Sequence, residues 1–183
     1  MPRTTFYGRK NIQVTFQPNI GLDATARQSV VEILNLLLAD EAVLSTKTHR
    51  AAEHAVENDA PDLQPLYETQ SKEINAIVIE IAERVRILGG SGPGSPEELI
   101  NCARLDGKQI LVPGVMAVLA DHEAFIRFLR EDAQQCSEMY EDQGTFALLV
   151  DVLRQHEKMA WVLRSQIENT SLHAASPDKV GLD

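Results

Sequence analysis

Apolar residues recur every three or four positions over four long stretches of this chain, which is the spacing of one face of an α-helix. The first stretch covers about residues 24–56, and the second runs from residue 61 to the pair Gly89-Gly90. The third covers about 113–141 and the fourth about 145–168. Beyond their first residues, all four lack glycine and proline. The pattern therefore predicts four long amphipathic helices.

The connection between the second and third of these helices has a helix signal of its own. A glycine-rich loop at 89–94 is followed by Ser95-Pro96-Glu97-Glu98, which combines an N-cap serine, a first-turn proline and a capping-box glutamate. We therefore expect a short helix through about residue 104. A connection of about twenty residues can cross a bundle and leave the flanking helices parallel. The sequence thus predicts an all-α fold, a ferritin-like four-helix bundle with a short helix in the connection between helices two and three.

The remaining segments are short and polar. Only residues 11–16 alternate between polar and apolar positions, and they lie inside an N-terminal arm that we place at 1–22. The bundle is expected over 23–169 and a C-terminal tail over 170–183. We expect both arms to be assembly elements or disordered segments.

Charge and composition narrow the classes of function. The chain has 183 residues with 27 acidic against 17 basic side chains, a net charge of −10, so its surface is expected to attract cations and repel nucleic acid and anionic lipid. No apolar run reaches the roughly 18 residues of a membrane span, and no secretion signal is evident at the N-terminus. Cys102 and Cys136 form no CxxC motif, which argues against a thiolate zinc site or a disulfide framework. We expect a cytoplasmic protein in which both cysteines are small core residues, with a partly exposed Cys136 as the alternative.

Four segments together resemble one family. They are LSTKTH at 44–49, EIAERVRILGG at 80–90, ADHEA at 120–124 and QHEKMAW at 155–161. In this order they resemble the Dps mini-ferritins, the DNA-binding proteins from starved cells. The resemblance implies a homo-oligomeric cage, a hollow dodecamer, that oxidises Fe(II) with peroxide or oxygen and stores ferric iron under oxidative stress. Several members of the family also bind DNA.

The resemblance also implies where iron would be oxidised. The family's site lies between two subunits, and its five ligand positions fall here on Ala52, Gln64, Glu68, Ile79 and Glu83. Only the two glutamates keep a metal-binding carboxylate, because both imidazoles and one carboxylate are replaced. The resemblance therefore implies an iron site whose ligand set is reduced or rebuilt.

Helix geometry bears on Glu68 and Glu83 independently. Together with Lys72, Asn75 and Ile79 they form a second stripe on helix two, away from its core stripe. The two glutamates are 15 residues apart, about 22 Å along a helix, so a shared ion requires two antiparallel copies of the helix. We expect the isoleucine to mark a buried contact. The alternative is that both glutamates are surface carboxylates or pair with Lys72 or Arg84 across the interface between subunits.

Histidines could supply the missing nitrogen ligands. His49 lies one turn before Ala52, and His54 lies just beyond it. The alternative for each is a helix-end histidine that interacts with terminal carbonyls. His122 and His156 each precede a glutamate, but an intrasubunit di-iron site needs Glu-x-x-His pairs on two helices and this chain contains none.

Two further expectations follow from the resemblance. The acidic residues Glu138, Glu141, Asp142 and Asp151 fall where the family lines a three-fold pore, and three copies would focus a negative potential that draws Fe(II) inward. Their alternative is a solvated helix end. The N-terminal arm carries Arg3, Arg9 and Lys10, which could bind DNA weakly through avidity.

The sequence thus supports two hypotheses. The first is an iron-sequestering cage with an atypical ferroxidase site. The second is a structural cage subunit without ferroxidase activity, which co-assembles with an active paralogue or encloses something else.

Overall fold

Six helical segments make up the part of the chain that the computed structural model describes, which is residues 17–55, 57, 60–93, 95–107 and 114–174. No strand occurs within those ranges. In chain order the segments are α1 (Ala24–His54), the short 3-10 helix η1 (Pro61–Leu63), α2 (Gln64–Ile87), α3 (Pro96–Cys102), α4 (Val115–Glu138) and α5 (Gln143–Ala174). The predicted all-α bundle is confirmed.

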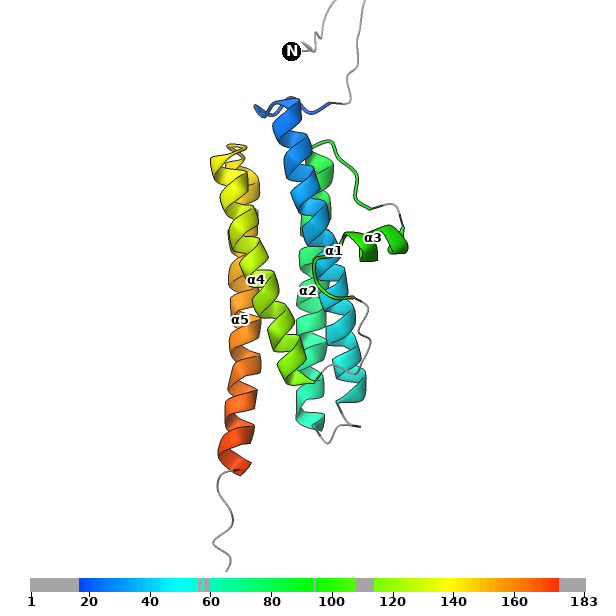
Figure 1. Ribbon diagram of the computed structural model, residues 1–183, viewed down its shortest axis with the longest axis vertical. Coiled ribbons are helices and arrows are strands. Elements are labelled where there is room, and N and C mark those ends of the chain that lie inside the picture. The colour runs from blue at the N-terminus through cyan, green and yellow to red at the C-terminus, as the bar shows by residue number, and fades with distance from the viewer. Residues whose placement is uncertain (1–16, 56, 58–59, 94, 108–113, 175–183) are drawn as a thin grey trace, which may run out of the picture.

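Two antiparallel helix pairs form the bundle, as Figure 1 shows. Helices α1 and α2 make one pair and α4 and α5 make the other, while α3 lies against the outside of α1. The segment containing α3 runs back along the bundle, so α4 starts at the same end as α2 and runs parallel to it (Figure 1). This is the crossing connection that the sequence predicted.

Helix ends follow local sequence signals. Asp23 caps α1 by accepting a hydrogen bond from the Ala26 amide at 2.9 Å, and Ser95 caps α3 by accepting one from the Glu98 amide at 3.1 Å. The last helix extends to residue 174 rather than 168, since neither glycine nor proline occurs between Gly144 and Pro177.

The core consists of the inner faces of all four long helices. Fully buried side chains come from α1 (Leu34, Leu37, Leu44), α2 (Ile74, Ile77, Ile81), α4 (Phe125, Leu129) and α5 (Leu149, Leu163). These residues are spaced by three, four, seven or fourteen positions along each helix, as the hydrophobic pattern predicted. Their removal from water is the main force that holds the bundle together.

A buried carboxylate on α1 fixes the crossing connection. Asp40 is fully buried and accepts hydrogen bonds from the amides of Arg104 (2.6 Å) and Leu105 (2.9 Å). The Arg104 side chain returns to Asp40 through Nε at 2.8 Å and reaches Asp132 on α4 through Nη1 at 2.9 Å. Its guanidinium also stacks 4.3 Å from the centre of the Phe128 ring. One arginine therefore ties the crossing connection to α1 and α4 together.

None of the described helices combines the length and the apolar character that a bilayer-spanning helix needs.

Candidate functional site

The two candidate iron ligands, Glu68 and Glu83, lie on the outer side of α2. Both are exposed, and they share this side with Ile79, whose side chain is 60% exposed. The predicted second stripe is therefore present and lies outside the core. Gln64 donates a hydrogen bond to Glu68 at 2.9 Å. Because the two glutamates are about 22 Å apart on one straight helix, a single subunit does not bring them together.

The histidines at the end of α1 face glutamates. His49 is exposed, and its Nε2 lies 3.5 Å from Glu53 Oε1. His54 Nδ1 lies 2.5 Å from Glu57 Oε2. Ala52, between them in sequence, is only 3% exposed and packs in a small apolar cluster at that end of the bundle. Each imidazole therefore contacts a carboxylate of its own chain segment.

The acidic residues proposed for a pore differ in how far they are available. Glu138, Glu141 and Asp151 are exposed, and Glu141 has a positive φ of 53° in the turn between α4 and α5. Asp142 is buried, forms an ion pair with Arg84 and accepts hydrogen bonds from Thr145. The carboxylate of Asp142 is thus already fully used within the subunit.

The basic residues proposed for DNA binding, Arg3, Arg9 and Lys10, lie outside the described residues.

A group of ionisable residues that the helix patterns did not bring together lies inside the bundle. His122 on α4 and His156 on α5 are both fully buried, and their Nδ1 atoms are 3.0 Å apart. The other nitrogen of His156, Nε2, is 2.9 Å from Oε1 of the fully buried Glu41 on α1. The ring of Phe125 packs edge-on against His156 at 4.7 Å. Three helices therefore contribute side chains to one hydrogen-bonded chain, in the spatial order Glu41, His156, His122.

Burial shapes the protonation of this chain. Burial raises the pKa of Glu41, and the neighbouring His156 opposes that rise. Burial lowers the pKa of His122 to about 3, with a further contribution from His156, so His122 is neutral at physiological pH. Within the described residues, Glu41 Oε2 and His122 Nε2 have no hydrogen-bond partner.

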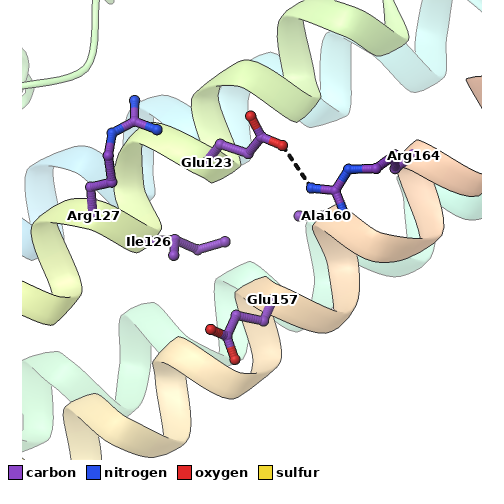
Figure 2. Close-up of a pocket in the computed structure, with 6 residues that line it drawn as sticks. All are labelled: Glu123, Ile126, Arg127, Glu157, Ala160 and Arg164. Carbon is purple, nitrogen blue, oxygen red and sulfur yellow. Dashed lines mark hydrogen bonds and ion pairs between the residues drawn. The ribbon is translucent and has the colours of Figure 1, made fainter.

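A shallow groove separates the outer sides of α4 and α5 (Figure 2). Glu123 accepts a hydrogen bond from Arg164 across it at 2.7 Å, while Ile126 and Ala160 form its floor. Glu157, which also lines the groove, pairs with Arg130. The acidic and basic side chains that line the groove are equal in number, so it has no dominant charge.

No group of three or more carboxylate, imidazole or thiol side chains within the described part of the subunit is arranged to hold a metal ion. Sequence reasoning did not single out Glu41. Its position among apolar residues at helical spacing, with Asp40 beside it, was the signal that a polar cluster lies in the core.

Comparison with known proteins identifies the family. The model of the ferritin-like domain matches residues 31–172. A low temperature-induced protein of Nostoc is 37% identical over 154 residues, 82% of this chain and 86% of its own length. DNA protection during starvation protein 2 of Bacillus anthracis is 26% identical over 141 residues, 75% of this chain and 96% of its own length. This chain belongs to the Dps family of ferritin-like proteins.

Solved Dps structures share the fold. DpsC from Streptomyces coelicolor superposes with a TM-score of 0.76 at 23% identity, over 95% of this chain and all of that one. The Dps protein of Vibrio cholerae, described as a member of the ferritin-like diiron-carboxylate proteins, gives a TM-score of 0.75 at 22% identity, over 85% of this chain and 99% of that one. The resemblance inferred from the four sequence segments is confirmed, and so is the Dps fold.

Proposed function

We propose that this Dps protein forms a hollow homo-oligomeric cage in the cytoplasm that takes up and stores iron and protects the cell under oxidative stress. Membership of the ferritin-like family supports iron storage as its general role. The observation that carries the specific proposal is the outer side of α2, where two exposed carboxylates flank an exposed isoleucine.

Two subunits are needed to complete the oxidation site. When two copies of α2 pack antiparallel, Glu68 of one subunit lies near Glu83 of the other. Their oxygens are hard ligands suited to iron, but they are two ligands where the family uses five. Fe(II) is the substrate: each bound ion gives up one electron, and one H2O2 accepts two electrons and two protons to give two water molecules. The missing imidazoles predict slow oxidation.

The same packing explains the exposed isoleucine. Ile79 exposes 60% of its side chain in the isolated subunit, and antiparallel packing of α2 removes it from water. The family's dodecamer is the assembly that we propose.

Iron enters, in this proposal, past exposed carboxylates. Three copies of Glu138, Glu141 and Asp151 around a three-fold axis give a negative potential that attracts Fe(II). Asp142 stabilises the turn that contains Glu141 and joins the helices of Glu138 and Asp151.

Oxidation kinetics test the proposal. The cage mass is measured by light scattering, and Fe(III) formation is followed with O2 and with H2O2 for the wild type and for Glu68→Ala/Glu83→Ala. The matched control is Glu32→Ala/Glu131→Ala, which removes the same charge from exposed positions on α1 and α4. We expect oxidation faster than in buffer, lost in the first variant and kept in the control.

A buffer-level rate in the assembled wild type would overturn the ferroxidase proposal. The second candidate, a structural cage subunit, would then hold. It is favoured by Ala52, Gln64 and Ile79 at the positions where the family has ligands. DNA binding through Arg3, Arg9 and Lys10 is tested by a gel shift at low salt, where electrostatic binding is strongest.

A further inference from the structure

Glu41, His156 and His122 form a linear chain of polar groups in the interior of the bundle. The three residues come from α1, α5 and α4, and all are fully buried. Linear order is the important feature, because a metal ion needs donors that converge on one point. Here the carboxylate and the second imidazole bind opposite sides of the central ring.

Counting protons shows what the chain can hold. Each of its two hydrogen bonds needs one proton, and two neutral imidazoles supply two in total. His156 Nε2–H then donates to Glu41, and His122 Nδ1–H donates to His156. In this state the carboxylate is ionised, the chain has a net charge of −1, and His122 Nε2 and Glu41 Oε2 are both unprotonated and lack partners in the described structure.

Within the described residues no lysine or arginine pairs with Glu41, whose partner is His156. Asp40 is the other charged group that acts on Glu41, and His156 acts on both Glu41 and His122. Asp40 is itself occupied by Arg104. Lys47 of α1 is paired with Asp121 of α4.

The fourth helix, α2, adds no charge to this region. Its Ile74 and Ile77 belong to the same core, and its buried ionisable group is Tyr67, whose pKa is raised by burial so that the phenol stays neutral. A buried carboxylate with no lysine or arginine beside it is unfavourable in such surroundings, and one added proton removes its negative charge.

We propose that Glu41 is a proton-binding site inside each subunit, and that it exchanges between carboxylate and carboxylic acid at the end of its hydrogen-bonded chain with His156 and His122. The third proton brings the chain to zero net charge, and both hydrogen bonds remain possible because the two imidazoles can reverse their tautomers. The proton binds where α1 meets the α4–α5 pair, so pH changes the charge buried between the two halves of the bundle.

Infrared difference spectroscopy of the assembled, iron-free protein tests this inference without reference to iron chemistry. Spectra are compared between about pH 9 and pH 6, where exposed carboxyl groups remain ionised because their ordinary pKa values lie near 4. We expect the carbonyl band of a protonated carboxylic acid to grow as pH falls and to shift on deuteration.

Two variants assign the band. It should vanish in Glu41→Gln, whose amide oxygen can still accept the His156 hydrogen bond, and persist in Glu32→Gln, which changes an exposed glutamate of the same helix. The proposal is overturned by a wild-type spectrum without the band, by imidazolium bands in its place, or by a band that survives Glu41→Gln. Because the wild-type spectrum alone can refute it, the test does not depend on the variant folding.

Discussion

Arg84 near the end of α2 holds Asp142 at the start of α5 through both carboxylate oxygens, with Nη2 2.7 Å from Oδ1 and 3.0 Å from Oδ2. The Arg84 Nε also donates to Thr145 at 2.9 Å, and Asp142 caps α5 by accepting from the Thr145 amide. Burial opposes ionisation of Asp142, but the hydrogen bonds from Thr145 and Arg84 outweigh it, so the pKa of Asp142 lies below its usual value. One ion pair therefore closes the end of the bundle where α2 meets the α4–α5 turn.

Replacement of Arg84 should destabilise the subunit. Arg84→Met leaves a buried carboxylate without its cation, and we expect the subunit to lose about 3 kcal/mol of stability at neutral pH. The loss should shrink as acid protonates Asp142. Denaturant unfolding at fixed protein concentration measures it. Arg127→Met, at an exposed position, is the control and should change stability by less than about 0.5 kcal/mol.

Asp40 gives a second stability prediction. Asp40→Ala leaves two amides and the Arg104 Nε–H without their acceptor, so we expect a loss of about 3 to 5 kcal/mol and faster proteolysis of the connection near Arg104. Glu97→Ala, in the exposed first turn of α3, is the comparison. Equal cleavage of the two variants would show that Asp40 does not hold the connection in place.

The lowered pKa of His122 predicts how the free energy of unfolding varies with pH. The pKa of His122 is about 3 in the folded protein against 6.5 for an ordinary histidine. Its contribution to stability is therefore complete above pH 6.5 and is lost as pH falls toward 3. The loss amounts to at most about 1.4 kcal/mol per pH unit. Glu41, with a raised pKa, acts in the opposite direction.

The measurement is therefore a difference between two curves of unfolding free energy against pH. Wild type and His122→Leu both keep Glu41, and the variant should lack the acid-side loss that His122 causes. His49→Leu, at an exposed histidine, should follow the wild type. Parallel curves for wild type and His122→Leu would contradict the prediction.

The cysteines should differ in reactivity. Burial, with help from Asp142 and Asp132, raises the pKa of Cys136 to about 12, whereas Cys102 is partly exposed at the end of α3. A thiol reagent at neutral pH should modify one cysteine per subunit quickly, and Cys102→Ser should abolish that fast phase. A fast phase that remains in the variant would place Cys136 at an accessible surface.

Local sequence signals were enough to predict most of the fold. The apolar spacing of Leu34 and Leu37, the Gly89-Gly90 stop and the Ser95 cap each depend on neighbours along the chain, so they gave the helices and the crossing connection. The residues around Glu68 and Glu83 could also be assigned to an outer stripe, because one helix determines its own faces.

Contacts between helices could not be derived in the same way. Arg84 was considered as a partner for the glutamates of the outer stripe, but the structure pairs it with Asp142, 58 residues away. His122 and His156 were assessed separately, and Glu41 was not singled out, because helical periodicity does not determine how one helix is rotated against the next. Their meeting depends on the packing of three helices.

The fixing of the connection by Asp40 also bears on biosynthesis. Asp40 belongs to α1, which leaves the ribosome before its amide partners at residues 104 and 105, and those partners are made before α4 and α5. A nascent chain that has emerged only this far already holds both sides of that contact. The path of the connection, and with it the direction in which α4 must start, can therefore be set while the second half of the subunit is still being translated.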